Sequence, residues 1–118
     1  MGNFRELKIW QEAKDLAVKV YKITGTGKFD KDYGLKDQIR RATVSISSNI
    51  AEGDERNSNK EAIRFLYIAN GSVAEVITQL FIAFEIGYID KDDFELITKR
   101  LETLSKQIKS LINYRRSN

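Results

Sequence analysis

Apolar residues recur at helical spacing in four stretches of the chain, and short polar or glycine-containing joints separate these stretches. The second stretch, for example, places Leu35, Ile39, Ala42, Ile46 and Ile50 on one side of a helix. In the fourth stretch the apolar steps alternate between three and four residues, as in the seam of a helical bundle. The periodicity predicts helices over about residues 4–24, 34–52, 58–86 and 90–114.

Capping signals mark the starts of the third and fourth predicted helices. Ser58 and Glu61 form the S-x-x-E pattern of a capping box, in which both side chains bond to free amide groups of the first turn. Asp90 is the expected cap of the fourth helix. We expect glycines to end the first three helices, namely Gly25, Gly53 and Gly87. A left-handed turn is predicted at Gly53.

Two stretches are harder to interpret from their pattern. Residues 25–33 form the longest irregular joint, and we expect Phe29, together with Tyr33, to fix it against the rest of the chain. The alternation in residues 44–48 also fits a β-strand, and these residues are poor helix formers. We favour a helix there, because the helical stripe continues on both sides and no partner strand exists elsewhere.

Short connections between successive helices make neighbours antiparallel. The sequence therefore predicts an all-α fold, an antiparallel up-down-up-down four-helix bundle, in which residues 1–118 form a single domain.

Composition narrows the functional classes. The 118 residues include no Cys, no His and no Pro, and the formal net charge is +3. Without Cys or His the chain offers no disulfide, thiol nucleophile, imidazole base or ordinary zinc or haem site. We predict no catalytic residues, no metal, no cofactor and no enzymatic activity. No secretory signal is visible behind the first residues, so a cytoplasmic location is expected.

The third predicted helix is apolar on nearly all sides. Residues 65–86 contain no Lys or Arg, and only Glu75 and Glu85 are charged. A helix that is apolar all round is buried all round. Polar residues make a membrane span unsuitable, so we predict that the second apolar face packs on another subunit, although scattered apolar residues can also be exposed. The predicted interface residues are Gly71, Val76, Phe81, Ile82 and Phe84.

Gly71 has a possible role of its own, because a glycine in the middle of a helix costs about 1 kcal/mol relative to alanine. We interpret Gly71 as a point of close helix approach, opposite Ser47, Ser48 and Ala51 of the second helix. The alternative is that this glycine is merely tolerated.

Basic residues gather in the second helix and at the start of the third. Some have an acidic residue one turn away, so part of their charge is neutralised locally. No helix-turn-helix, zinc finger or aromatic RNA platform accompanies them. Copies of a weak patch repeated in an oligomer would bind phosphates more tightly. The candidate nucleic-acid-binding residues are Lys36, Arg40, Arg41, Arg56, Lys60 and Arg64.

Four motifs carry a family resemblance: QIRRATVSISSNIAEG at residues 38–53, RNSNKEAIRFL at 56–66, YIANGSVAEVITQL with GYI at 67–89, and LKIWQEA at 7–13. With them the chain resembles the bacterial four-helix bundle family of intervening-sequence proteins, which are encoded within insertions in large-subunit ribosomal RNA genes. The resemblance implies a homopentameric ring and a similarity to the accessory variability protein of diversity-generating retroelements, which binds nucleic acid and a reverse transcriptase. It also implies structural roles for Ser47, Asn49, Glu52, Gly53, Gly71, Ser72 and Glu75.

Two functional hypotheses follow. The first is a non-enzymatic homo-oligomeric bundle, pentameric by the resemblance, that binds RNA or a nucleic-acid-handling partner through a repeated basic surface. The second is an oligomeric protein–protein adaptor without a nucleic-acid role, whose protein partner uses an apolar groove. Neither hypothesis involves a membrane.

Overall fold

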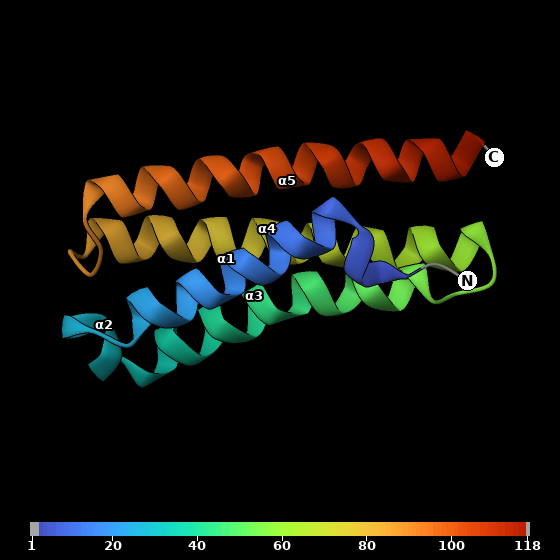
Figure 1. The fold of residues 1–118 in the computed structure, drawn as a ribbon. Helices are drawn as coiled ribbons and strands as arrows, with labels where there is room; N and C mark the ends of the chain where they lie inside the picture. Colours follow the sequence, from blue (N-terminus) through green and yellow to red (C-terminus); the bar gives the residue numbers. More distant parts are fainter. Residues whose placement is uncertain (1–2, 118) are drawn as a thin grey trace.

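The computed structural model describes residues 3–117. A short 3-10 helix, η1 (Phe4–Glu6), precedes five α-helices: α1 (Lys8–Thr24), α2 (Gly27–Lys31), α3 (Tyr33–Asp54), α4 (Asn59–Glu85) and α5 (Lys91–Ser117). No strand occurs within residues 3–117, so the prediction of an all-α chain is confirmed. The four long helices lie side by side in a rod of 46 × 21 × 20 Å (Figure 1).

The rod has two different ends. At one end lie α2 and the turn between α4 and α5, and at the other lie η1, the turn between α3 and α4, and the last turns of α5 (Figure 1). Among the long helices, α3 packs most extensively on α4, whereas α1 packs on α3 more than on α5. This order places residues from the start and the end of the chain beside the α3–α4 turn.

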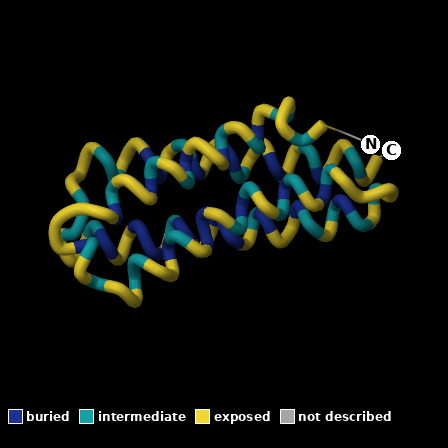
Figure 2. The backbone as a smooth tube through the Cα atoms, turned by 60° about the horizontal axis from the view of Figure 1, so that its bottom comes forward, coloured by how far each residue is buried: buried dark blue, intermediate teal, exposed yellow. Residues whose placement is uncertain are grey.

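The core lies along the axis of the rod, where each long helix contributes one apolar stripe (Figure 2). These stripes have the spacing expected of amphipathic helices. The stripe of α3 passes through the alternating stretch at residues 44–48, so the helical interpretation of that stretch is confirmed. The largest fully buried side chains are Phe29, Leu16, Ile39, Ile46, Ile50, Leu80, Ile97, Leu101, Leu104, Ile108, Val20 and Val73.

The predicted caps are present at the starts of α4 and α5. The Ser58 hydroxyl accepts a hydrogen bond from the Glu61 amide at 3.2 Å, and Asp90 Oδ1 accepts one from the Asp93 amide at 2.8 Å. The predicted capping box is only half formed among the described residues, because the Glu61 carboxylate forms an ion pair with Arg64 at 3.5 Å rather than a bond to the Ser58 amide. The first predicted helix is interrupted at Leu7, whose backbone is extended (φ −72°, ψ 126°), so η1 and α1 are separate elements.

Gly87 ends α4 as predicted, with a φ of 83°. The amide of Tyr88 donates to the Ala83 carbonyl at 2.8 Å and that of Gly87 to the Phe84 carbonyl at 3.1 Å. This pair of bonds is the Schellman motif, and its left-handed residue favours glycine. Gly25 follows the last residue of α1, as expected.

Gly53 does not take the predicted left-handed conformation, and α3 continues through it to Asp54. A β-carbon at Gly53 would lie 3.1 Å from the Ala62 carbonyl oxygen and 3.2 Å from the Phe65 β-carbon. The glycine is therefore required because α3 and α4 approach closely here, whereas the sequence interpretation had placed the close approach at Gly71.

The joint at residues 25–33 contains the five-residue helix α2. Phe29 is fully buried and its ring lies 5.3 Å from that of Tyr88, so its predicted role in fixing the joint is confirmed. The same prediction was wrong for Tyr33, which is 70% exposed. Tyr33 is the first residue of α3, and its ring lies outside, against the Lys36 ammonium group at 5.1 Å.

The helix α4 is long and apolar enough to cross a membrane by length and composition alone, with a mean hydropathy of 1.4 in its most apolar window. Only 33% of that window is buried. Polar bonds nevertheless tie α4 to both neighbours: Ser72 donates to Ser45 of α3 at 3.0 Å, and Ser105 of α5 donates to Asn70 at 2.7 Å. The fold thus leaves part of the apolar surface of α4 uncovered.

Candidate nucleic-acid interface

The six candidate nucleic-acid-binding residues do not form one surface. Lys36, Arg40 and Arg41 lie in the first half of α3, whereas Arg56, Lys60 and Arg64 lie around the α3–α4 turn at the other end of the rod. Lys36 lies eighteen residues before Asp54, the last residue of α3, which corresponds to about 27 Å along the helix. The structure therefore divides the sequence-predicted set into two groups of three.

Two residues of the first group are held by partners within the chain. The Lys36 ammonium group forms an ion pair with Asp30 at 3.0 Å and its side chain is 14% exposed. The Arg40 guanidinium donates to the Thr24 hydroxyl at 2.8 Å and to the Tyr21 carbonyl at 3.1 Å. It also lies over the Tyr21 ring, 4.4 Å from its centre. Both residues thus attach α3 to α1 and α2.

The second group surrounds an aromatic ring at the α3–α4 turn. The guanidinium groups of Arg56 and Arg64 lie 4.6 and 5.0 Å from the centre of the Phe65 ring. Arg56 also forms a 2.7 Å ion pair with Glu52, while Arg64 keeps 62% of its side chain exposed. The two cation–π contacts with Phe65 therefore hold the guanidinium groups of Arg56 and Arg64 at the protein surface.

Two candidate residues have no hydrogen-bond or ion-pair partner among the described residues, Arg41 and Lys60. Both are exposed. Lys60 lies in the first turn of α4, next to Arg56 and Arg64 in the second group. It is therefore the member of that group whose charge is most available to a ligand.

The end of α5 adds basic residues that the sequence interpretation did not include in the candidate site. Arg115 forms a 3.5 Å ion pair with Asp54 and a 3.2 Å hydrogen bond with Asn59, and Arg116 donates to the Tyr67 hydroxyl. The sequence did show basic residues in the last turns of α5, but only as a favourable interaction with the helix dipole. Residues 52–64 and 106–117 together carry seven basic and four acidic side chains.

The predicted interface residues on α4 are also divided by the structure. Phe81 and Ile82 are 46% and 47% exposed and line a surface groove of ≈ 560 Å³. Phe84 is half-buried, and its ring stacks on Phe94 of α5 at 4.4 Å. We name the groove the α4 groove, and it is lined by Ile77, Thr78, Phe81, Ile82, Glu85 and Ile86.

One interface prediction, Val76, and the packing role given to Gly71 need correction. Val76 is fully buried, because it belongs to the stripe of α4 that faces the core, and it cannot contact another subunit. Gly71 is exposed, and a β-carbon there would meet no atom within 4 Å. Gly71 is therefore not the point where α4 approaches Ser47, Ser48 and Ala51. Within a single chain, the alternative interpretation applies: the helix tolerates this glycine and does not require it for packing.

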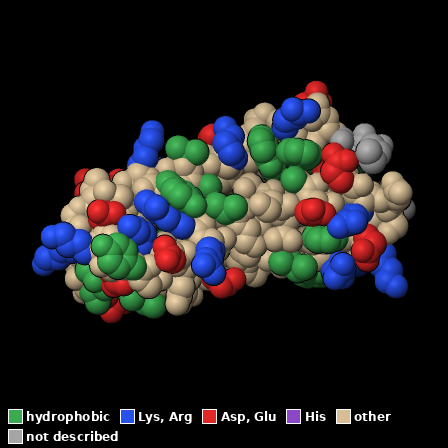
Figure 3. Space-filling model, turned by 90° about the horizontal axis from the view of Figure 1, so that it is seen from below, with side chains coloured by type: hydrophobic (Ala, Val, Ile, Leu, Met, Phe, Trp, Pro, Cys, Tyr) green, Lys and Arg blue, Asp and Glu red, His purple; other side chains and the backbone are tan. Residues whose placement is uncertain are grey.

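A second apolar groove lies between α1 and α3, and the sequence interpretation did not identify it. Val18, Tyr21 and Val44 are 48%, 44% and 40% exposed and lie in this groove. We name it the α1/α3 groove, and it is lined by Lys14, Ala17, Val18, Tyr21, Lys22, Val44 and Ser47. On the face of the molecule seen from below, hydrophobic side chains form separate groups with Lys and Arg side chains among them (Figure 3).

Asp32 is an electrostatic link at the α2 end of the rod. Its carboxylate accepts hydrogen bonds from the Leu35 amide at 3.1 Å and from the Tyr88 hydroxyl at 2.9 Å. These two bonds, the amide first, lower the pKa of Asp32 below its ordinary value. The same carboxylate raises the pKa of the Tyr88 hydroxyl. The pair joins the start of α3 to the α4–α5 turn.

Within residues 3–117 no group of three or more His, Cys, Asp or Glu side chains is placed to hold a metal ion. The site is therefore described by its charges and apolar surfaces alone. Together with the fold they define a class: a small helical bundle with an exposed basic end and uncovered apolar grooves.

The chain belongs to the family of 23S rRNA-intervening sequence proteins, whose model matches residues 5–110. The structure is also similar to a solved one, a protein of unknown function from the S23 ribosomal protein family of Bacteroides thetaiotaomicron, with a TM-score of 0.81 and 25% sequence identity. The similarity covers 88% of this chain and 97% of that one. No curated protein matches the chain.

Proposed function

We propose that the protein is a non-enzymatic, homo-oligomeric bundle that binds RNA, alone or within a nucleic-acid-handling complex, through its basic end. One observation carries this proposal: Arg56 and Arg64 are held against Phe65 at an exposed helix turn, beside the unpaired Lys60. Arginine and lysine at such positions bind phosphate oxygens, and the exposed edge of an aromatic ring can contact an unstacked base. The name of the family, which refers to 23S rRNA, supports the same partner.

One copy of this surface is weak. Four acidic residues in the same region offset seven basic ones. Since phosphate affinity rises with the number of cations engaged, several copies in one assembly would strengthen binding. We propose a ring of five copies, the number that the family resemblance implies, built from an antiparallel up-down-up-down bundle. The placement of both turns and both chain ends in Figure 1 supports that topology.

The uncovered apolar surface of α4 supports self-association. Phe81, Ile82 and Ile86 are each about half exposed, and contiguous apolar patches of this kind mark interaction sites. An RNA-binding role places the protein in the cytoplasm. The absence of Cys and His from the sequence supports a role without catalysis.

The test is a titration of a fluorescein-labelled RNA hairpin with the nuclease-treated protein between about 50 and 200 mM salt. We expect the double variant Lys60→Glu, Arg64→Glu to weaken RNA binding at least tenfold. The slope of log Kd against log salt concentration should fall by the amount that corresponds to the loss of about two phosphate contacts. The matched control is Lys91→Glu with Lys99→Glu, which makes the same charge change on exposed positions of α5. Equal losses in both variants, or no binding at the lowest salt, would contradict the proposal.

A second candidate function is an oligomeric protein–protein adaptor without a nucleic-acid role. The observation in its favour is the α4 groove, whose lining is mainly apolar. An adaptor of this kind would retain its protein partner after nuclease treatment and lose it on Ile82→Glu. The RNA-binding proposal expects instead that nuclease releases the associated proteins.

A further inference from the structure

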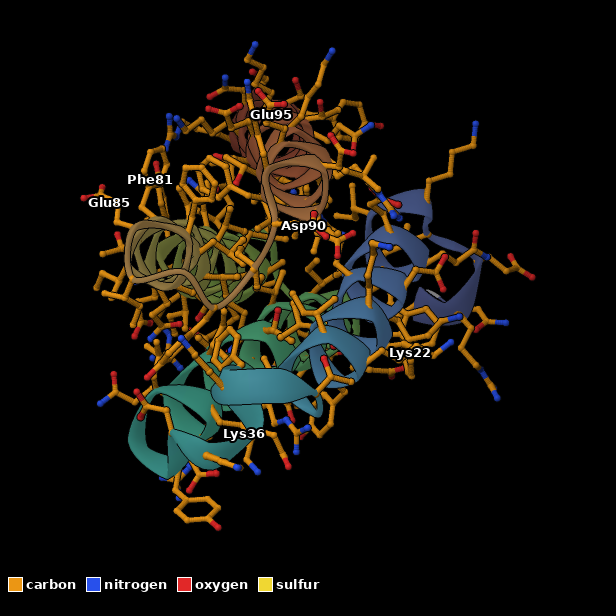
Figure 4. The ribbon with its side chains drawn as sticks, turned by 90° about the vertical axis from the view of Figure 1, so that its left-hand side faces the viewer. Lys22, Lys36, Phe81, Glu85, Asp90 and Glu95 are labelled. Carbon is orange, nitrogen blue, oxygen red and sulfur yellow. The ribbon has the colours of Figure 1, made fainter. Side chains whose placement is uncertain are left out.

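The molecule has two exposed apolar grooves on different faces. Phe81 and Glu85 lie on the outer side of α4, whereas Lys22 lies on α1, on the other side of the bundle (Figure 4). The α4 groove and the α1/α3 groove have similar volumes, ≈ 560 and ≈ 480 Å³. Each contains aliphatic and aromatic side chains between about 40% and 50% exposed.

The charges around the two grooves are opposite. Glu85 is the charged residue in the lining of the α4 groove. The charged residues in the lining of the α1/α3 groove are Lys14 and Lys22, and Lys14 also forms a 2.9 Å ion pair with Asp15. Arg40 adds a further cation, because its guanidinium covers the Tyr21 ring of this groove.

We propose that the α4 groove of one copy docks on the α1/α3 groove of the next copy, in a head-to-tail contact. This inference rests on the self-association in the proposed function and adds the surface that receives α4. The two grooves would exclude water from apolar side chains on both copies, and Glu85 of one copy would face the lysines of the other. Complementary charges of this kind fix orientation and suppress wrong partners.

The charges also argue against the alternative contact, in which two α4 grooves meet across a two-fold axis. That contact would bring Glu85 of both copies, with the acidic start of α5, to the same interface. Like charges placed together in an interface disfavour the contact. A head-to-tail contact joins different surfaces, so an open row of copies has one free groove of each kind, one at either end, until the row closes into a ring or grows into a filament.

The basic residues of the protein then have two separate tasks. Those around Lys22 and Arg40 serve the contact between copies, and those around the α3–α4 turn stay exposed. The two groups lie at different ends of the rod, so assembly would leave the basic end uncovered and repeat it in every copy.

The test uses two variants that each damage one groove, Ile82→Glu and Val18→Glu. Both positions are exposed on helices, and glutamate is a good helix former, so circular dichroism should show unchanged helicity. Light scattering should give a multimer for the unsubstituted protein and a monomer for each variant. The control is Leu96→Glu on α5, which is 48% exposed and outside both grooves, and which should keep the multimer.

Mixing the two variants gives the decisive result. Each variant retains the groove that the other has lost, so the mixture should form a species of two chains and no larger one. A mixture that stays monomeric, or a Val18→Glu variant that keeps the unsubstituted mass, would overturn the head-to-tail contact.

Two further outcomes separate this inference from the proposed function. An unsubstituted protein that is monomeric after nuclease treatment would overturn both self-association and the head-to-tail contact. A multimer that resists Val18→Glu but still binds the RNA hairpin would overturn only the contact. Charge reversal provides an independent check, since Glu85→Lys should weaken the multimer and Lys22→Glu in the same chain should restore it.

Discussion

A group of three basic residues lies at each end of α3, one within the helix and one around the turn into α4, and the surroundings of the two groups differ. At the start of the helix Lys36 and Arg40 satisfy acceptors on α2 and α1, and Phe29 of α2 is fully buried at the same end of the rod. At its end Arg56 and Arg64 lie on a half-buried ring, Phe65, and remain at the surface. Exposure separates the two groups: Lys36 keeps only 14% of its side chain exposed and holds helices together, whereas Arg64 keeps 62% exposed and contributes to a surface.

The largest expected effect comes from removing the buried ring at the first end. Phe29→Ala should lower the free energy of unfolding by about 3–5 kcal/mol, because a fully buried aromatic side chain leaves a cavity. The control is Phe65→Ala at the second end, where the half-buried ring should cost much less. Urea denaturation followed by circular dichroism measures both, and equal losses would show that the two ends are built alike.

The next effect concerns the arginines of α3. Arg40→Ala should destabilise the protein by about 1.5–3 kcal/mol, since it removes charge-assisted hydrogen bonds to Thr24 and Tyr21. Its neighbour Arg41 is exposed and has no partner among the described residues, so Arg41→Ala should change stability by no more than about 0.5 kcal/mol. Thermal unfolding of the two variants gives the comparison. A loss in Arg41→Ala as large as that in Arg40→Ala would contradict the assigned contacts.

The glycines give a comparison of similar size. Gly53→Leu at the end of α3 should destabilise by about 1–3 kcal/mol, because the new side chain meets the backbone of α4. Gly71→Leu should instead raise stability by up to about 1 kcal/mol, since open space surrounds that position and leucine favours the helix. Chemical denaturation checks both. If the two substitutions act in the same direction, the close approach at Gly53 is not what requires the glycine.

The smallest effect is the pH dependence of the Asp32–Tyr88 link. The folded state lowers the pKa of Asp32, so its contribution is present above the unfolded value of about 4 and is lost as the pH falls through the folded value. Asp32→Asn should therefore reduce the loss of stability on acidification. Denaturation between about pH 2 and 6 measures it. The raised pKa of Tyr88 predicts a further loss at alkaline pH, as the pH rises through the folded value.

Most of the fold could be predicted from the sequence because its determinants are local. Helical periodicity located the four long helices, and the caps at Ser58 and Asp90 lie where the pattern indicated. The left-handed turn at Gly87 followed from the same kind of signal. The errors at Gly53 and Tyr33 concern tertiary packing, since only the approach of α4 shows that Gly53 must lack a side chain.

The candidate site was less predictable, because it depends on which helices become neighbours. Residues of α5 beside the α3–α4 turn, such as Arg115, are far from it in sequence. Val76 is apolar like Phe81, and only the direction of its side chain separates core from surface. The helical phase of α4 could have assigned Val76 to the core, since it shares its buried stripe with Leu80 and Ala83.

The bundle closes where its first long helix meets its last. Arg100 of α5 donates two hydrogen bonds to Glu12 of α1, at 2.9 and 2.8 Å, and this bidentate pair lies along a contact less extensive than that between α1 and α3. We therefore expect native-state fluctuations to separate α1 from α5 before they separate the other pairs of helices. In deuterated water we expect the amides of α1 to exchange sooner than those of α4, and Glu12→Gln to widen the difference in their protection.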